Sequence, residues 1–395
     1  MFPTDVVILA GARTPMARYN GEFANISAID LGALAAKEAI KRSGVDSAEV
    51  EHVVFGNVQQ SSSDAHYGAR HVGLKAGLKV ETPAVTVNRL CGSGMEAISQ
   101  AAQRILLGEA KMILAGGMEN MTQVPHVIRG ARSGFRLGEG KLEDALMAGL
   151  LDPISGCTMS DTAENLAVEY KITRRESDEY ALRSQQAAEA AYQACRMSEE
   201  IVPVEVGKGK KAHLFSQDDH RRPDTTMESL SLLPPAFRKD GVVTAGNASG
   251  IVDGAAAVVM TTEKSAKEHG AKPLGRIVSW ATTGVEPRVM GIGPVPSSKK
   301  ALQLAGLKLE QIDLVEVNEA FAPQYLAVEK ALGLNRDKTN VNGGAIALGH
   351  PLGATGTRLI LTLLLELRRR SQRYGLATAC IGGGQGIAMI VESMS

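Results

Sequence analysis

The chain has 395 residues, of which 44% are hydrophobic, 22% are charged and 4% are aromatic. A chain of this length is expected to form roughly two or three compact units, and the composition excludes an intrinsically disordered protein. Lys and Arg together number 43, as do Asp and Glu, so no overall basic field would attract nucleic acid or an anionic membrane.

Targeting and redox signals are sparse. The apolar run at residues 6–10 is short and follows no basic residue, which predicts a strand and not a signal peptide. No apolar stretch reaches the ~20 residues of a membrane-spanning helix. The four cysteines, Cys91, Cys157, Cys195 and Cys380, lack CxxC spacing, which argues against a zinc site or a disulfide framework, and no metal site is predicted. We expect a cytoplasmic bacterial protein without membrane insertion, and a mitochondrial-matrix location is the less favoured alternative.

Two distant stretches follow the same order of elements. Residues 83–113 read as a strand, a glycine-bearing turn and a helix leading into a second strand, and residues 339–384 repeat this order around another glycine-rich turn. Asn88 and Asn342 stand at matching points. We infer an internal duplication, and the alternation of strands and helices predicts an α/β fold of layered halves.

The repeat sets the expected boundaries. Residues 1–120 would form an N-terminal half that residues of about 246–270 complete, and residues 271–395 would form the C-terminal half. Residues 121–245 carry clusters of Pro, Gly, His and charge around one long helix, which is typical of an inserted loop domain. A basic cluster in this region is interpreted either as a solvated surface loop or as a flap that contacts phosphate. Its members are Lys208, Lys210, Lys211, Arg221 and Arg222.

Cys91 stands between a predicted strand and the helix that begins CGSGMEAI. Unpaired amides at a helix N-terminus favour a thiolate, so this position predicts a pKa below the ~8.5 of a free cysteine. Gly92 and Gly94 would let substrate reach the sulfur. A buried, inert cysteine at a strand–helix junction is the alternative.

The run at residues 92–97 also satisfies G-x-G-x-x-G/A after a strand and before a helix, which is the dinucleotide-binding fingerprint. An NAD-dependent dehydrogenase is therefore an alternative function. Against it, the match lies outside the opening strand–helix unit, and no obvious acidic residue ends a strand about 20 residues later. P-loop, HExxH and G-x-S-x-G motifs do not occur in the sequence, which excludes those enzyme classes.

Three further residues carry reactive groups near glycine-rich segments. His350 lies in GGAIALGHPLGATG, where small neighbours predict an exposed imidazole that can act as a general base. Cys380 ends a predicted buried strand, and the glycines after it have amides that can form an anion-binding nest. Asn318 follows a strand and would fix a water, orient an imidazole or cap a helix. A hydrogen-bonded loop histidine and a structural cysteine are the alternatives for His350 and Cys380.

Together these residues resemble the thiolase family. The matching segments follow one another along the whole chain: NRLCGSGMEAI at 88–98, VTAGNASGIVDGAA at 243–256, NEAF at 318–321, GHPLGATG at 349–356 and CIGGGQG at 380–386. The resemblance implies a thiolase-like fold of duplicated αβαβα layered halves with an inserted loop domain. It also implies a homodimer or homotetramer.

The resemblance implies catalytic roles for five residues. Cys91 would hold the acyl group after activation by His350, and Cys380 would act as acid and base. One oxyanion hole would be formed by His350 and a water held by Asn318. A second would be formed by the backbone N–H groups of Cys91 and Gly382.

Coenzyme A and acyl-CoA would be substrates, and no tightly bound cofactor is implied. The loop domain and the TAGNASG turn would contact CoA through Arg222, Thr225, Ser229, Ala245 and Ser249. The pantetheine tunnel would be lined by Phe237, Met290, Ala320 and Phe321.

One departure bears on the subtype. Many biosynthetic thiolases place a His directly before the Met of GCTMSDTAENLA, whereas Thr158 precedes Met159 here. This argues against specialisation for acetoacetyl-CoA. The stretch VEVNEAFAPQYLAVEKALGL at 315–334 and the RRPDTT loop at 221–226 resemble degradative 3-ketoacyl-CoA thiolases of the matrix type, which would act in fatty acid β-oxidation by a reversible thiolysis or Claisen condensation. The alternatives are a biosynthetic acetyl-CoA acetyltransferase that makes acetoacetyl-CoA and a non-catalytic CoA or lipid carrier. A β-ketoacyl synthase would use one Cys with two His and lack the second thiol.

Overall fold

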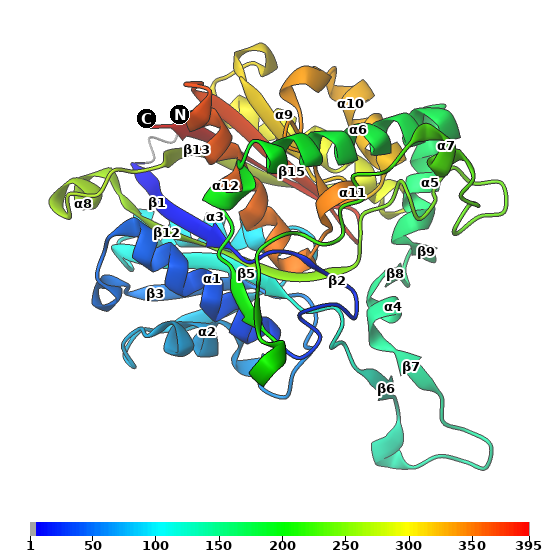
Figure 1. Ribbon diagram of the computed structural model, residues 1–395, viewed down its shortest axis with the longest axis horizontal. Coiled ribbons are helices and arrows are strands. Elements are labelled where there is room, and N and C mark those ends of the chain that lie inside the picture. The colour runs from blue at the N-terminus through cyan, green and yellow to red at the C-terminus, as the bar shows by residue number, and fades with distance from the viewer. Residues whose placement is uncertain (1–4, 395) are drawn as a thin grey trace.

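A large mixed sheet forms the frame of the molecule. In the computed structural model, which describes residues 5–394, this 10-stranded sheet runs across the molecule (Figure 1). Its order is β14, β15, β16, β13, β1, β12, β5, β3 and β4, and the short β2 pairs with β12. The strands are β1 (Val6–Arg13), β2 (Ala17–Arg18), β3 (His52–Gly56), β4 (Ala84–Val87), β5 (Met112–Glu119), β12 (Val252–Thr262), β13 (Gly275–Gly284), β14 (Leu314–Val317), β15 (Tyr374–Ile381) and β16 (Gln385–Ser393).

The sheet has two parts that meet between β1 and β13. The pairing there covers two residue pairs, Val7 with Arg276 and Ile8 with Gly275. In the first part β3 is parallel to β4 and β5, and in the second part β14 is parallel to β15. The strands nearest the junction are antiparallel to their neighbours in both parts. The two parts therefore repeat one arrangement, and the predicted α/β fold is confirmed.

Helices form three layers around the two parts of the sheet. Helices α1 (Ala28–Ser43) and α2 (Gly68–Ala76) cover the outer face of the first part. Helices α9 (Pro294–Ala305) and α10 (Ala322–Leu332) cover the outer face of the second. Between the two parts lie α3 (Ser93–Leu106) and α12 (Leu352–Arg369), which share one core with both (Figure 1). Residues 352–367 of α12 are all buried, and most of them are apolar or small, as expected of a helix with no solvent-facing side. The two charged residues among them, Arg358 and Glu366, form ion pairs.

The strand predicted at residues 339–342 is the main local difference. The segment forms isolated bridges only, one of them between Val315 and Thr339. The side chain of Asn340 replaces a backbone ladder, because its Oδ1 accepts the N–H of Val317 at 2.8 Å and its Nδ2 donates to the carbonyl of Val317 at 2.9 Å. Asn340 is left-handed, with a φ of 48°, which interrupts an extended strand.

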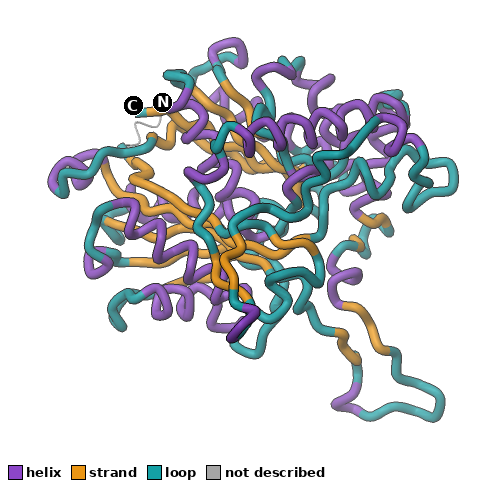
Figure 2. Tube along the Cα trace, in the orientation of Figure 1, coloured by secondary structure: helices purple, strands orange, loops and turns teal. Residues whose placement is uncertain are grey.

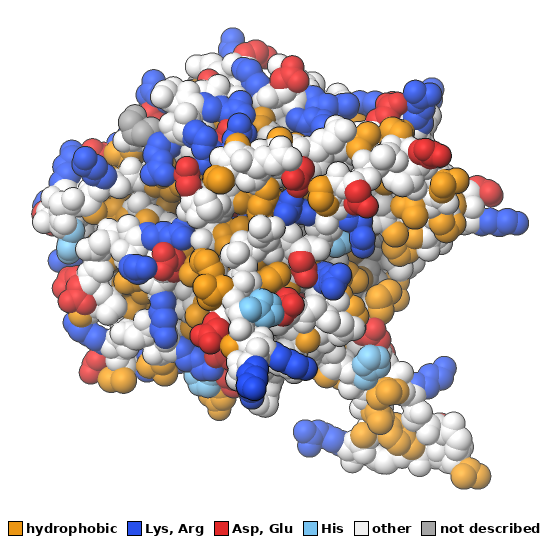
Figure 3. All heavy atoms as spheres, viewed as in Figure 1, with side chains coloured by type: hydrophobic (Ala, Val, Ile, Leu, Met, Phe, Trp, Pro, Cys, Tyr) orange, Lys and Arg blue, Asp and Glu red, His pale blue; other side chains and the backbone are white. Residues whose placement is uncertain are grey.

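The segment between β5 and β12 forms small elements outside the large sheet. A hairpin of β6 and β7 projects from the body of the molecule (Figure 1). A long connection joins its two strands (Figure 2), and apolar side chains lie on its surface (Figure 3). No helix in the described part of the chain is long and apolar enough to cross a membrane. The elements of this segment are β6 (His126–Ile128), β7 (Leu142–Asp144), α4 (Ala145–Gly149), β8 (Leu151–Asp152), β9 (Cys157–Thr158), α5 (Met159–Glu169), α6 (Arg174–Gln193), β10 (Val204–Val206), β11 (His213–Phe215) and α7 (Met227–Ser231).

Candidate active site

Cys91 lies on a tight turn between β4 and α3. Leu90, just before it, has a left-handed backbone with a φ of 46°, which is uncommon for a bulky residue. Two side chains hold the turn: Asn88 Oδ1 accepts the N–H of Leu90 at 2.9 Å, and Ser93 Oγ donates to the Leu90 carbonyl at 2.7 Å. The turn fixes Cys91 at the start of α3 with 9% of the residue exposed.

Burial raises the pKa of the Cys91 thiol to about 11, although N–H groups of Gly382 and of Cys91 itself donate toward the sulfur and lower it. The predicted lowering of this pKa by the helix N-terminus is therefore wrong for the free protein. The cost of removing a thiolate from water outweighs the attraction of the two N–H groups. The thiol is neutral at pH 7 and needs a base to become a nucleophile.

Gly92 and Gly94 were predicted to open a path to the sulfur, and this prediction is wrong. A Cβ on Gly92 would lie 2.6 Å from Ile381, and a Cβ on Gly94 would lie 2.7 Å from the backbone nitrogen of Thr357 in α12. These glycines allow α3 to approach the second half of the molecule. Because protein atoms fill the space beside them, they cannot cradle a dinucleotide.

His350 lies between the short helix α11 (Ala345–Leu348) and α12, and it is 5% exposed, so the prediction of an exposed imidazole is wrong. Its Nδ1 is 2.6 Å from the hydroxyl oxygen of Thr355, which donates its own proton to the carbonyl of Pro351 at 3.0 Å. The Thr355 oxygen therefore accepts a proton from Nδ1. This leaves Nε2 of the neutral ring as a proton acceptor.

The charge state of His350 suits that role. Burial, followed by the positive charge of Arg358, lowers the pKa of His350 to about 3. Arg358 is itself buried and pairs with Glu316 at 3.1 Å. The imidazole is consequently neutral at physiological pH, and a neutral imidazole can accept a thiol proton.

Asn318 follows β14 and contacts His350, with 3.2 Å between Nδ2 of Asn318 and Nε2 of His350. Its Oδ1 is buried and has no hydrogen-bond partner within residues 5–394, so a donor such as water can bind there. The alternative that Asn318 caps a helix is wrong, because α10 begins at Ala322 and its N-cap residue is Phe321. That Asn318 orients the imidazole stays a prediction, for which this contact provides the geometry.

Cys380 lies near the end of β15 and is fully buried. Burial, together with the nearby Cys91 sulfur, raises the pKa of the Cys380 thiol far above its usual range. The structure therefore brings both sulfurs and the N–H of Gly382 into one place. Cys380 packs in a small apolar cluster with Met290 and Ala320, two residues that had been predicted to line the pantetheine tunnel. Phe321 and Met159 lie against the same cluster.

A cavity of about 160 Å³ opens at Cys91. Its lining includes Cys91, Gly382, Met159 and Leu352, together with residues 149–153. The walls are mostly apolar, which suits the thioester end of an acyl chain. Sequence reasoning missed the 149–153 segment, since no motif marks it.

Thr355 is the second residue that sequence reasoning missed. It lies five residues after His350 within GHPLGATG, and its hydroxyl fixes which ring nitrogen carries the proton. One signal could have identified Thr355. It is a hydroxyl residue in the first turn of the helix that follows the loop histidine.

The other predicted CoA contacts lie nearer the surface. Arg222, Ser229, Phe237 and Ala245 are exposed, and Thr225 and Ser249 are partly buried. Two of the hydroxyls already have partners: Thr225 donates to the carbonyl of Arg222 at 2.7 Å, and Ser229 donates to the carbonyl of Thr226, the N-cap residue of α7, at 2.9 Å. Phe237 is 51% exposed and lies outside the cluster of Cys380, Met290 and Ala320.

The two arginines of the basic cluster differ in environment. Arg221 stacks on the ring of Tyr192, with its guanidinium carbon 3.6 Å from the ring centre, and pairs with Glu189. The guanidinium of Arg222 has no protein partner in the described residues, and its backbone N–H donates to Gln185 at 2.9 Å. Arg222 is therefore the arginine of this pair that is available to an anionic ligand.

Comparison with known proteins agrees with this geometry. The family model described as thiolase, N-terminal domain, matches residues 6–264, and the model described as thiolase, C-terminal domain, matches residues 271–393. The chain belongs to the thiolase family. It is 52% identical to the mitochondrial 3-ketoacyl-CoA thiolase of Homo sapiens over 389 residues, which covers 98% of each chain. It is 51% identical to the acetyl-CoA acetyltransferase of Escherichia coli (strain K12) over 391 residues, which covers 98% of this chain and 99% of that protein.

Solved structures show the same relationship. The crystal structure of the human mitochondrial 3-ketoacyl-CoA thiolase in complex with CoA matches with a TM-score of 0.96 at 52% identity, and the match covers 98% of each chain. As a thiolase, the protein is an enzyme of the acyltransferase class. This assignment replaces the dehydrogenase and carrier alternatives. The relatives include degradative and acetyltransferase names at nearly equal identity, so the subtype must be argued from the site.

Proposed function

We propose that this thiolase is a 3-ketoacyl-CoA thiolase that works through an acyl-enzyme on Cys91, and that it serves fatty acid β-oxidation. The observation that carries the proposal is a pair of neighbouring buried thiols, together with a neutral histidine that Asn318 and Thr355 hold in place. Cys91 lines the cavity and the fully buried Cys380 lies close enough for the Cys91 sulfur to raise its pKa. The N–H of Gly382 points at the Cys91 sulfur, and His350 presents an acceptor nitrogen next to Asn318. Covalent and proton-transfer catalysis need this combination of nucleophile, base and second acid.

In the thiolysis direction, Cys91 passes its proton to Nε2 of His350 and attacks the 3-keto carbon of the substrate. The bond between C2 and C3 then breaks, which leaves the acyl group on Cys91 and an enolate of acetyl-CoA. The enolate takes its proton from Cys380. Its oxygen needs preorganised donors, and His350 with a water on Asn318 supplies them.

The second half-reaction restores the enzyme. The thiol of CoA gives its proton to the Cys380 thiolate and attacks the acyl group, whose oxyanion is held by the N–H groups of Cys91 and Gly382. Acyl-CoA leaves, and the Cys91 thiolate recovers its proton from His350. Run in reverse, the same steps are a Claisen condensation of acyl-CoA with acetyl-CoA.

We place CoA between the loop domain and the turn at residues 244–250. The guanidinium of Arg222, which has no protein partner among the described residues, supports a phosphate contact there. The other predicted contacts are Thr225, Ser229, Ala245 and Ser249. Met290, Ala320 and Phe321 pack beside Cys380, which supports a path for the pantetheine arm toward the sulfurs. Phe237 would have to turn inward to join that path, because it is exposed in the free protein.

The residue before Met159 supports the proposed subtype. Thr158 caps α5, and its hydroxyl bonds Asp161 at 2.7 Å, while Met159 lines the cavity. No imidazole stands at this position to contact a short acetoacetyl group, which supports a broader range of chain lengths. A biosynthetic acetyl-CoA acetyltransferase is the second candidate, supported by the Escherichia coli relative.

Assembly and location are predictions that follow from the same assignment. The exposed apolar side chains of the projecting β6–β7 hairpin, Leu137 and Leu142 among them, support association into a homodimer or homotetramer. The human relative is named mitochondrial and the other close relative is bacterial. A bacterial cytoplasmic location stays a prediction.

Cleavage assays on two thioesters test the proposal. Purified protein is incubated with CoA and either acetoacetyl-CoA or a longer 3-ketoacyl-CoA, and loss of the 3-keto thioester is followed. We expect Cys91→Ala and Cys380→Ser each to lower the rate by about a thousandfold or more. The exposed Cys195 provides the control Cys195→Ser, which should keep the wild-type rate.

The ratio of the two wild-type rates decides the subtype. Cleavage of both thioesters supports the degradative assignment, and cleavage of acetoacetyl-CoA alone supports the acetyltransferase. A wild-type protein that cleaves neither substrate would overturn the proposed reaction.

A further inference from the structure

The turn at residues 244–250 joins the two loops that carry the candidate catalytic polar groups. On one side the N–H of Ser249 donates to the carbonyl of Ala320 at 3.0 Å, two residues after Asn318 in the chain. On the other side the carbonyl of Gly250 accepts the backbone N–H of His350 at 3.0 Å. A displacement of Gly250 would therefore move the backbone on which His350 is mounted.

The imidazole of His220 lies directly against Gly250. A Cβ placed on Gly250 would lie 2.5 Å from Cε1 and Nε2 of His220 and 2.6 Å from its Cδ2. Neither ring nitrogen has a hydrogen-bond partner within residues 5–394, and burial, aided by the charge of Arg222, lowers the pKa of His220 to about 4. The ring is neutral at physiological pH and contributes its flat shape to this contact.

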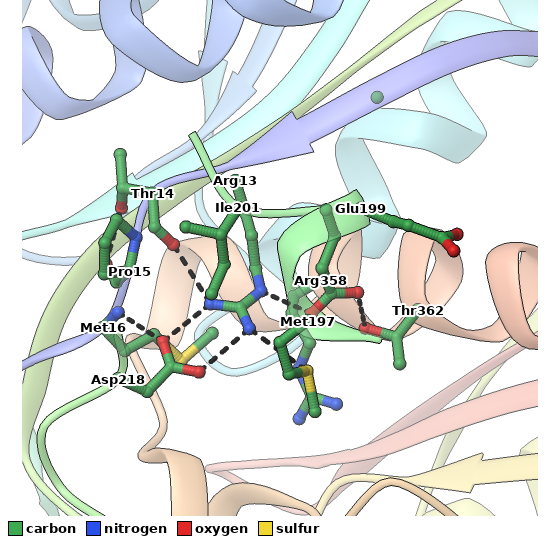
Figure 4. Close-up of polar contacts among 12 residues, drawn as sticks. Arg13, Thr14, Pro15, Met16, Met197, Glu199, Ile201, Asp218, Arg358 and Thr362 are labelled. Carbon is green, nitrogen blue, oxygen red and sulfur yellow. Dashed lines mark hydrogen bonds and ion pairs between the residues drawn. The ribbon is translucent and has the colours of Figure 1, made fainter. Parts of the chain in front are cut away.

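A buried ion pair fixes the chain just before His220. Arg13 donates from Nη1 and Nη2 to the two carboxylate oxygens of Asp218 at 2.7 and 2.9 Å, and the N–H of Met16 donates to the same carboxylate at 2.7 Å (Figure 4). Both partners of the ion pair are almost completely buried. Buried pairs of this kind hold a fixed geometry, because breaking one leaves a charge without compensation.

The chain just after His220 is fixed as well. The N–H of Arg222 donates to Gln185 of α6 at 2.9 Å, and Arg221 stacks on Tyr192 of the same helix. His220 thus sits in a short segment that is held at both ends. The position of its ring against Gly250 follows from anchors in β1 and α6.

We propose that His220 is a positioning residue for the thiolase reaction, which holds the CoA-binding loop against Gly250 and so fixes His350 relative to bound CoA. This rests on the proposed role of Arg222 in CoA binding and of His350 as the base for Cys91. The ring links the segment that ends in Arg222 to the backbone of His350 through one van der Waals contact. Small displacements of a reacting group can cost up to about a hundredfold in rate, so such a contact is worth maintaining.

Three variants test the link with two readouts. His220→Ala removes the ring, Gly250→Ala pushes it away, and His220→Phe keeps a flat ring without nitrogens. The readouts are the KM for CoA in thiolysis and the rate at which iodoacetamide alkylates Cys91 in the absence of CoA. The second readout needs no CoA and reports on Cys91 together with His350, the proposed acceptor of the thiol proton during alkylation.

We expect His220→Ala and Gly250→Ala each to raise the KM for CoA and to slow alkylation, both by about tenfold. His220→Phe should rescue both quantities to within about twofold, since no hydrogen bond is lost. The double variant His220→Ala/Gly250→Ala should be no worse than His220→Ala, because the two changes disrupt one contact. The exposed His213 of β11 supplies the matched control His213→Ala, in which neither readout should change.

Two outcomes would overturn the inference. If His220→Ala raised the KM for CoA but left the alkylation rate unchanged, His220 would not reach His350. If His220→Phe behaved like His220→Ala, the nitrogens and not the packed ring would matter. A wild-type protein without thiolase activity would instead defeat the proposed function, and the alkylation assay would still measure the link between His220 and His350.

Discussion

At the scale of single residues, the site holds its reactive groups in their neutral forms. Burial raises the pKa of Cys91 to about 11 and lowers that of His350 to about 3, so a thiolate–imidazolium pair is not populated in the free enzyme. Transfer of the thiol proton to His350 is therefore expected only while the sulfur bonds to an electrophile, whether that is the substrate or iodoacetamide. The N–H groups of Gly382 and Cys91, which point at the Cys91 sulfur, are predicted to stabilise the oxyanion that forms beside it.

The hydroxyl of Thr355 is predicted to set the tautomer of His350. Thr355→Val keeps the shape of the side chain but leaves Nδ1 without an acceptor, so the ring can place its proton on Nε2, where it cannot accept one from Cys91. We expect kcat to fall by about a hundredfold, the low end of what a general base contributes. The KM for CoA should change little, because Thr355 lies behind the imidazole.

Thr355→Ser is the matched control, since serine keeps the hydroxyl and should restore most of kcat. The pH profile of alkylation of Cys91 by iodoacetamide provides an independent readout. If Thr355→Val and wild type shared the same kcat, the Nδ1 contact would have no part in catalysis.

At the scale of elements, helix α6 connects the loop that carries Asn318 to the segment predicted to bind CoA. Tyr180 and Ser184 each donate a hydrogen bond of 2.7 Å to Glu319, the residue after Asn318. Farther along the same helix, Gln185 accepts from the backbone of Arg222. One rigid helix therefore sets the distance between the polar group that contacts His350 and the predicted phosphate contact.

The crossing of α3 and α12 depends on glycine. A Cβ on Gly356 would lie 2.2 Å from the backbone nitrogen of Met95. The Met95 nitrogen cannot move away without shifting helix α3. We expect Gly356→Ala to lower the free energy of unfolding by about 3 kcal/mol, as overpacking in a tight core does. Urea denaturation followed by circular dichroism measures this change.

Gly73 of α2 provides the comparison, since a Cβ there would lie 3.1 Å from a side-chain methyl of Val53. Gly73→Ala should be neutral or stabilising, because alanine favours a helix by up to about 1 kcal/mol over glycine. Equal destabilisation by both substitutions would contradict the special role of the crossing.

At the scale of the whole molecule, the two repeated parts meet so that Cys91, Leu352 and Gly382, which come from three distant motifs, line one cavity. Cys91 comes from the turn before α3, and Cys380 comes from β15 of the other part. His350 precedes α12, which packs against α3 in the central layer. Duplication thus places two equivalent strand–helix junctions face to face, with the chemistry between them.

Much of this could be predicted from the sequence, because motifs and periodicity are local. The α/β alternation, the internal repeat and the set of Cys91, His350, Cys380 and Asn318 all follow from residues read in order. Burial is not local, so the pKa of Cys91 and the exposure of His350 were predicted wrongly. The missing strand at residues 339–342 has a similar origin, since the side chain of Asn340 bonds a strand that is distant in the chain.

The central claim is that Cys91 carries the acyl group, and mass spectrometry tests it most directly. The enzyme is mixed with acetyl-CoA in the absence of an acceptor, quenched in acid, and analysed as intact protein and as peptides. We predict one acetyl group on the peptide that contains Cys91, and none in Cys91→Ala. An acetyl group on Cys380 instead, or the absence of any covalent adduct in an active enzyme, would contradict the account.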